Sequence, residues 1–185
     1  MAELEELVQH LIRREEIPLR EGMHHAVEVT RFAAMRHAKL SAQWLKVGYV
    51  QGNMNSDNCL VGGYTMDYGP FGFIEKYDPL WSPFTSDPER KFGFERQPHA
   101  AHINLVTLAR ALAPLLDGNE SQMEALQRVV SEEYTVFLQK ELGEVLNLAL
   151  FMKLLFVFAI LFAIIFHPLL RKGALTTCID SPLLL

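Results

Sequence analysis

The most informative stretch of the chain is residues 54–69, Met-Asn-Ser-Asp-Asn-Cys-Leu-Val-Gly-Gly-Tyr-Thr-Met-Asp-Tyr-Gly. Two short β-type runs flank the pair Gly62-Gly63, which is the pattern of a two-residue hairpin turn. In that register Asn58 lies opposite Asp67, and opposed side chains project from one face with Cβ atoms about 4.5–5.5 Å apart. The sequence therefore predicts a β-hairpin that brings an amide and a carboxylate together.

This amide and carboxylate pair has two interpretations. Magnesium typically takes only one or two protein oxygen ligands and keeps its other positions for water and phosphate, a demand that Asn58 and Asp67 would meet. The alternative is a hydrogen-bonded Asn/Asp pair that merely closes the hairpin. The residues around the pair are needed to choose between a metal site and a structural pair.

Those surroundings are similar to the metal-binding segments of protein kinases. Asp67 opens an Asp-Tyr-Gly sequence before a long Gly/Pro-rich stretch, as the kinase Asp-Phe-Gly motif does. The kinase pattern His-Arg-Asp-Leu-x-x-x-Asn, aligned on Asn58, falls on Gln51, Gly52 and Asn53, so the usual kinase base is missing. Asp57 is the nearby carboxylate that would accept a proton from an attacking hydroxyl. The pattern indicates a transfer reaction other than phosphorylation.

Two longer stretches strongly resemble the selenoprotein O (SelO) family: Ala-Gln-Trp-Leu-Lys-Val-Gly-Tyr-Val-Gln-Gly-Asn-Met-Asn-Ser-Asp-Asn at 42–58 and Thr-Met-Asp-Tyr-Gly-Pro-Phe-Gly-Phe at 65–73. The resemblance implies a pseudokinase fold and a magnesium-dependent protein adenylyltransferase, which transfers AMP from ATP to Ser, Thr or Tyr hydroxyls of proteins. By position it implies that Asp57 is the proton acceptor, Asn58 a magnesium ligand, and Asp67 a magnesium ligand that also contacts ATP.

The chain also departs from the family pattern. Gln51 stands where the family usually has His, Asn53 where an apolar residue is common, and Cys59 where Met is common. The family's Gly-rich ATP-clamping region, Lys/Glu ion pair and phosphate-contacting arginines lie upstream of the catalytic loop, and no glycine-rich loop precedes Asp57 here. We therefore expect a C-lobe portion or truncated form. Two functions stay open: AMP transfer, or a catalytically dead C-lobe remnant that acts as a binding or membrane-anchored module.

Outside this stretch, the sequence predicts an α+β fold. The 185 residues are 50% apolar and carry a net charge of −5, which excludes a disordered chain and argues against a nucleic-acid partner. Apolar residues at helical spacing predict four helices, and a Gly/Pro-rich segment predicts a long, functional loop at 69–98. The expected fold is a kinase-like C-lobe, mostly helical, with a short hairpin at the metal site, over 1–146. The helices are expected at 3–14, 24–46, 99–116 and 121–146.

The remaining residues, 147–185, form an apolar tail. Residues 148–166 are all apolar except Lys153, and about twenty apolar residues span a bilayer core. Three interpretations stay open: a transmembrane helix at 148–166, an enclosed core helix, and an altered C-terminus from splicing or a wrong gene model. The tail predicts membrane association, whereas the family resemblance implies a mitochondrial location although the acidic N-terminus is no transit peptide.

Overall fold

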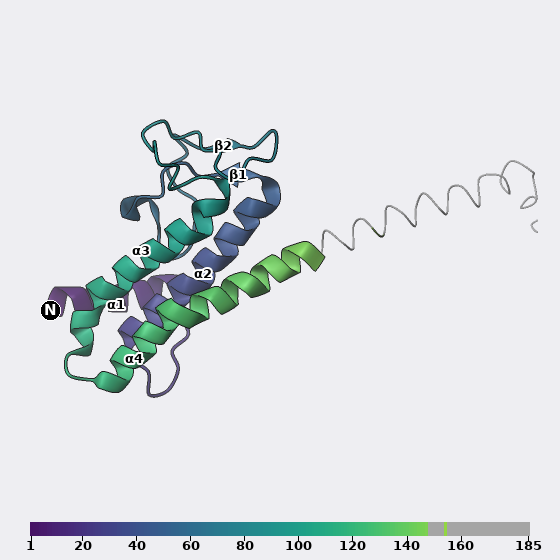
Figure 1. Cartoon of the computed structure of the whole chain (residues 1–185). Helices are drawn as coiled ribbons and strands as arrows, with labels where there is room; N and C mark the ends of the chain where they lie inside the picture. Colours follow the sequence, from purple (N-terminus) through teal and green to yellow (C-terminus); the bar gives the residue numbers. More distant parts are fainter. Residues whose placement is uncertain (148–153, 155–185) are drawn as a thin grey trace, which may run out of the picture. The chain divides into compact units, whose positions relative to one another are not determined.

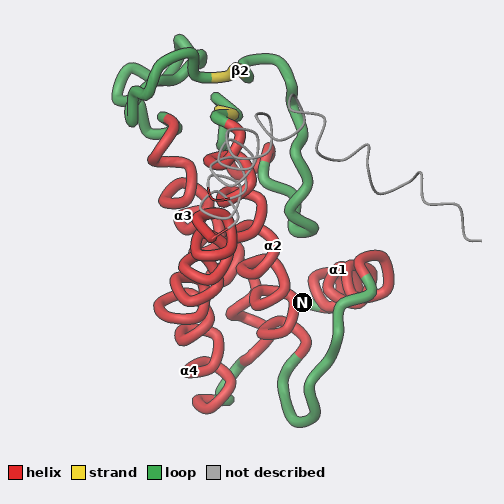
Figure 2. The backbone as a smooth tube through the Cα atoms, turned by 90° about the vertical axis from the view of Figure 1, so that its right-hand side faces the viewer, coloured by secondary structure: helices red, strands yellow, loops and turns green. Residues whose placement is uncertain are grey.

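The computed structural model describes residues 1–147 and 154, and the chain divides into two compact units, Met1–Val145 and Leu146–Leu185. The first unit is mostly helical with one small antiparallel sheet, which confirms the predicted α+β class. In this unit α2, α3 and α4 lie side by side, α1 lies against α2, and both strands lie at one end of α2 and α3 (Figures 1 and 2). This end carries the predicted site.

The central helix is α2 (His25–Val47), which follows α1 (Ala2–Glu15). It begins at His24, whose side chain accepts a hydrogen bond from the amide of Ala26, and it ends at Gly48 with a positive φ of 72°. Its buried residues include a run of small alanines that let neighbouring helices approach closely. The fully buried or nearly buried alanines of α2 are Ala26, Ala33, Ala34, Ala38 and Ala42.

Two further predicted helices are more irregular than the sequence pattern suggested. The segment 99–116 is α3 (Gln97–Leu112) followed by a 3₁₀ turn η3 (Ala113–Leu116). The segment 121–146 begins as α4 (Glu120–Arg128), passes through a π-helical turn η4 (Val129–Glu133), and continues as helix over 134–147. The helix positions are confirmed, but the π turn has no signature in the hydrophobic spacing.

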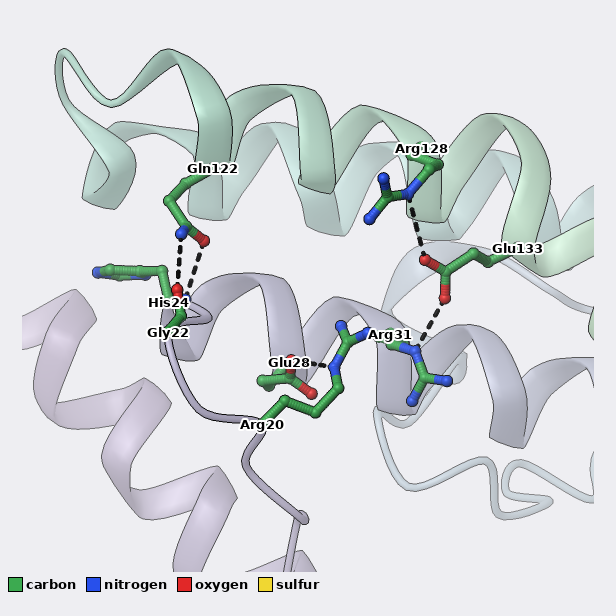
Figure 3. A network of polar contacts seen from close by, with 8 residues as sticks. All are labelled: Arg20, Gly22, His24, Glu28, Arg31, Gln122, Arg128 and Glu133. Carbon is green, nitrogen blue, oxygen red and sulfur yellow. Dashed lines mark hydrogen bonds and ion pairs between the residues drawn. The ribbon is translucent and has the colours of Figure 1, made fainter.

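Polar contacts join α4 and η4 to α2 and the segment before it (Figure 3). The Gln122 side chain donates to the carbonyl of Gly22 and accepts from the amide of His24, both at 2.9 Å. Glu133, at the end of η4, pairs with Arg31 of α2 at 2.8 Å. These contacts attach α4 and η4 to the first half of α2, the helix whose second half leads to the site.

The predicted hairpin with strands on either side of Gly62-Gly63 is wrong. The observed sheet pairs β1 (Tyr49–Val50) with β2 (Gly72–Phe73), and residues 59–67 form no strand. A turn closes between Leu60 and Gly63 through a 2.9 Å backbone hydrogen bond. This turn lies one residue earlier than predicted, and side chains of α2 hold it: Arg36 donates to the carbonyl of Gly62 and His37 to that of Leu60.

The long loop after the site is confirmed over most of its predicted length, 69–98. It contains β2 and a 3₁₀ turn η2 (Phe94–Arg96), and α3 begins at Gln97. Its own groups hold it: the buried Asp87 accepts from the amide of Phe92 at 2.9 Å, and Phe94 donates to the carbonyl of Trp81 at 3.0 Å. The loop is therefore a packed structure beside the site.

The predicted transmembrane segment 148–166 lies outside the described residues apart from Leu154. Over the part of the chain that the structure describes, no helix has both the length and the hydropathy to cross a bilayer.

Candidate functional site

The site begins where β1 leaves the sheet and turns sharply at Gly52. This glycine has a φ of 81°, and a Cβ placed on it would collide with the carbonyl oxygen of Pro70. Only glycine combines that conformation with such a close approach. The segment that carries Asp57 and Asn58 is thereby pressed against the segment that follows Asp67.

A buried network of two glutamines and a tyrosine supports this crossing. Gln51 accepts from the hydroxyl of Tyr49 at 2.7 Å and donates to the carbonyls of Met66 and Asp67. Gln97, at the start of α3, accepts from the amide of Gln51 and donates to the carbonyl of Tyr49, both at 2.9 Å. Since buried polar groups are costly unless satisfied, this network specifies one arrangement of β1, α3 and the backbone at Asp67.

The structure brings Asn58 and Asp67 together, as the sequence predicted. The Asn58 Nδ2 donates to Asp67 Oδ2 at 3.1 Å. Asn58 ends the 3₁₀ turn η1 (Ser56–Asn58), and Asp67 adopts a left-handed φ of 56°, which costs a non-glycine residue about 1 kcal/mol. The side-chain pairing was therefore right although the strands that were to impose it are absent from residues 59–67.

The observed contact is the hydrogen-bonded Asn/Asp pair that was the alternative to a metal site, and the oxygen atoms of the pair also have the chemistry that suits a magnesium ion. With the Asn58 amide turned to Asp67, the Oδ1 atoms of both residues have no hydrogen-bond partner within the described ranges. One amide oxygen and one carboxylate oxygen match the one or two protein ligands that Mg²⁺ typically takes. Across residues 1–147 and 154, no three His, Cys, Asp or Glu side chains gather as a metal cluster, so a site built on protein carboxylates alone is not seen there.

Asp57 lies between Ser56 and Asn58 on η1 with its carboxylate exposed to solvent. The side chain of Asn104, on α3, holds this turn through three hydrogen bonds. It donates to the carbonyl of Met54 at 2.8 Å and to the Cys59 sulfur at 3.0 Å, and it accepts from the hydroxyl of Ser56 at 2.9 Å. The position of Asp57 is thus set by its neighbours while its own side chain stays accessible to an incoming group.

The electrostatics around the site keep two nearby groups uncharged at neutral pH. Burial raises the pKa of the Cys59 thiol to about 11, and the negative charge of Asp57 adds to the increase. Burial, with smaller contributions from Tyr68 and Asp67, raises the pKa of Tyr49 to about 12. Cys59 is therefore a protonated packing residue, and the Tyr49 hydroxyl remains a donor to Gln51.

The supporting residues Gln51, Gln97 and Asn104 escaped the sequence argument. In the sequence Gln51 stands out only as a departure from the family pattern, and Gln97 and Asn104 do not stand out at all. Gln51 and Gln97 are buried amides, and a buried amide must find hydrogen-bond partners. Which partners it finds depends on contacts between positions 46 to 50 residues apart, which a local pattern does not contain.

Comparison with known proteins identifies related sequences. The family model described as protein adenylyltransferase SelO matches residues 2–162. The protein nucleotidyltransferase YdiU of Aromatoleum aromaticum is 45% identical over 112 residues, which cover 58% of this chain and 21% of that protein. The YdiU proteins of Rhodopirellula baltica and Xanthomonas axonopodis pv. citri are 39% and 40% identical, each over 69% of this chain.

This chain spans about a quarter of the length of these relatives, namely 21%, 24% and 25%. The matched segment includes Asp57, Asn58 and Asp67, together with the amides that support them. Since the family model matches most of the chain, the chain belongs to the SelO family.

Proposed function

We propose that this chain carries the metal-binding and proton-accepting part of a magnesium-dependent protein adenylyltransferase, on a kinase-like C-lobe. The observation that carries the proposal is the Asn58–Asp67 pair, at 3.1 Å, beside the accessible carboxylate of Asp57. The family description and the relatives' name, protein nucleotidyltransferase, support nucleotidyl transfer as the class of reaction.

In this proposal the three residues perform two tasks, metal binding and proton acceptance. Asn58 and Asp67 hold Mg²⁺, which when bound neutralises charge on the ATP phosphates. Asp57 accepts the proton of a Ser, Thr or Tyr hydroxyl as that oxygen forms its bond to the α-phosphorus of ATP. The bond from the α-phosphorus to the bridging oxygen breaks, pyrophosphate leaves, and the protein keeps an AMP group.

The supporting network explains how the pair stays in place. Gln51 holds the carbonyls of Met66 and Asp67, and Asn104 holds the turn at Ser56. The ligands therefore sit on backbone that is fixed from β1 and α3, which is the preorganisation that charge stabilisation requires. Ordinary kinase activity is the weaker candidate because Asn53 stands at the position of the kinase base.

Binding of ATP to the purified chain tests the proposal. We expect ATP binding that requires Mg²⁺ and that Asn58→Ala weakens by about tenfold or more, since one of two protein ligands is lost. Asn119→Ala is the matched control, because Asn119 is an exposed amide that caps α4. Binding that is unchanged in Asn58→Ala or indifferent to Mg²⁺ would contradict the metal assignment, and undetectable binding would favour a non-catalytic binding module.

A further inference from the structure

A groove runs alongside the turn that carries Asp57. Its main cavity, of about 620 Å³, lies between that turn, the end of the long loop and the first turns of α3, and Asn55, Ser56, Phe92 and Ile103 are among its walls. A second hollow of about 310 Å³ shares Asn55, Lys91 and Phe92 with the first, so the two adjoin. A third, of about 260 Å³, shares Ser56 and Asn104 with the main cavity. The main cavity and the second hollow therefore form one groove, and Ser56, the chain neighbour of Asp57, lines it.

The main cavity combines an apolar floor with a positively charged rim. Met54 and Ala100 are buried beneath it, and Ile103 is 52% exposed along its wall although it is a large aliphatic residue. Lys91 and Arg96 supply the positive charge of this rim, which His99 also lines, against one carboxylate, that of Glu95. This carboxylate already accepts a hydrogen bond of 2.6 Å from the hydroxyl of Tyr77.

The positive charges of Lys91 and Arg96 are not neutralised by strong ion pairs, so they can bind a negatively charged ligand. The Lys91 ammonium lies 3.5 Å from Glu89, but both side chains are more than half exposed, and such surface pairs contribute little. The Arg96 guanidinium donates through one nitrogen to the carbonyls of Glu89 and Arg90, which carry no net charge. In the adjoining hollow, the Asp87 carboxylate already accepts a hydrogen bond from the amide of Phe92. The main cavity is thus the cationic part of the groove.

We propose that this groove binds the acceptor polypeptide as an extended segment, with an apolar residue against Phe92 and Ile103 and an acidic residue facing Lys91 and Arg96. This inference rests on the proposed function, because it places the acceptor hydroxyl at Asp57. A chain of adjoining hollows suits an extended polypeptide better than a compact small molecule, and the positive rim selects an acidic one. The groove supplies the orientation that brings one hydroxyl to the carboxylate.

Peptide binding to the full chain tests this proposal without ATP or metal. Two fluorescent peptides share a central Ser and a flanking Leu, and differ by Asp or Lys at the positions beside them. We expect the acidic peptide to bind about tenfold more tightly, with a preference that weakens as salt is raised. Equal binding of the two peptides, or tighter binding of a single-stranded oligonucleotide than of the acidic peptide, would overturn the proposal.

Two variants locate the binding surface. Lys91→Glu should weaken the acidic peptide by about fivefold or more and reduce the preference, while Ile103→Ser should weaken both peptides alike. Lys39→Glu, an exposed lysine of α2 that lines none of the three hollows, makes the same charge change and should leave binding unaltered. If Lys91→Glu and Lys39→Glu behave alike while circular dichroism shows both folded, the groove is not the acceptor site. If the original chain binds the acidic peptide but transfers no AMP to it, the groove proposal stands and the proposed function is contradicted.

Discussion

Asp67 is the residue on which the site depends most, and its conformation is imposed by its surroundings. Its φ of 56° is unfavourable for a residue with a side chain, yet the Gln51 amide donates to its carbonyl and to that of Met66. Gln51 is buried, so these bonds are protected from competition with water. The carboxylate stays exposed and turns toward Asn58 because the backbone on either side is held.

Replacing Gln51 tests this support. Gln51→Leu removes the donor to two carbonyls and the acceptor for the Tyr49 hydroxyl, and should lower the free energy of unfolding by about 2–4 kcal/mol in urea titrations. Gln51→His keeps one ring donor and should cost less. Gln127→Leu, on an exposed glutamine of α4, is the control and should change stability by less than about 0.5 kcal/mol. Equal stability of Gln51→Leu and the control would show that the network adds nothing.

Cys59 gives a second test at this scale. With a pKa of about 11, the thiol has about one molecule in a thousand ionised at pH 8. In a Cys178→Ser background, iodoacetamide should therefore modify Cys59 at least about tenfold more slowly than a free cysteine peptide at pH 8, and denaturant should remove the difference. Modification of the folded chain at the peptide's rate would contradict the burial of the thiol beneath Asp57.

Residue identity in this site was more predictable than its backbone. Asp57, Asn58 and Asp67 were named from spacing and family resemblance, and the Asn58–Asp67 hydrogen bond confirms that two of them meet. The partners that fix them come from β1 and α3, at distances along the chain that no local pattern encodes. The predicted hairpin is wrong: the turn closes between Leu60 and Gly63, one residue earlier than predicted, and Arg36 and His37 of α2 bind the carbonyls of Gly62 and Leu60 there.

At the scale of elements, the helices follow the hydrophobic spacing closely. The expected helix at 24–46 is α2 (His25–Val47), with His24 as its N-cap and Gly48 as its positive-φ C-cap. The π turn at Val129–Glu133 interrupts a segment whose spacing looks uniform. Glu133 at its end binds Arg31 of α2, so a tertiary contact accompanies the irregularity that the spacing does not reveal.

The junction between α4 and the start of α2 depends on Gln122. Gln122→Ala removes two hydrogen bonds, to Gly22 and from His24, and should lower the free energy of unfolding by about 1–2 kcal/mol (Figure 3). Gln127→Ala on the same helix serves as the control, with an expected change below about 0.5 kcal/mol. The measurement is chemical denaturation of both variants. Matching midpoints for the two variants would rule out this junction as a stabilising contact.

The burial of His37, on α2 beside the turn at Leu60–Gly63, makes stability depend on pH. Burial lowers the pKa of His37, and the neutral ring donates to the carbonyl of Leu60 at 2.8 Å. Because the unfolded chain binds a proton near pH 6.5 and the folded chain does not, stability falls as pH drops below about 6.5, by at most about 1.4 kcal/mol per pH unit.

The variant His37→Gln separates this effect from the other histidines. Glutamine keeps a donor for Leu60 but does not titrate, so the variant should lose less stability between pH 7.5 and 5.5 than the original chain. Denaturation midpoints at several pH values measure the difference. Parallel pH dependence in the two proteins would show that His37 is not the titrating group.

For the molecule as a whole, the site lies at one end of the helical bundle. β1, the turn η1, the long loop and the start of α3 all gather there, whereas α4 and η3 lie toward the other end (Figure 1). The bundle therefore serves as the support, and the loops at its end carry Asp57, Asn58 and Asp67. The hydrophobic spacing could predict the helices, but only the specific motifs could predict which residues carry the chemistry.

The most direct test of the central claim is AMP transfer from ATP labelled at the α-phosphate, with ATP labelled at the γ-phosphate run in parallel. The proposal predicts that the purified chain, with Mg²⁺ and an acceptor protein, transfers the α label and not the γ label. Asp67→Ala should reduce transfer by about a hundredfold or more, whereas Asp117→Ala, an exposed carboxylate beyond the far end of α3, should retain it. Undiminished transfer by Asp67→Ala, or transfer of the γ label instead, would contradict the account.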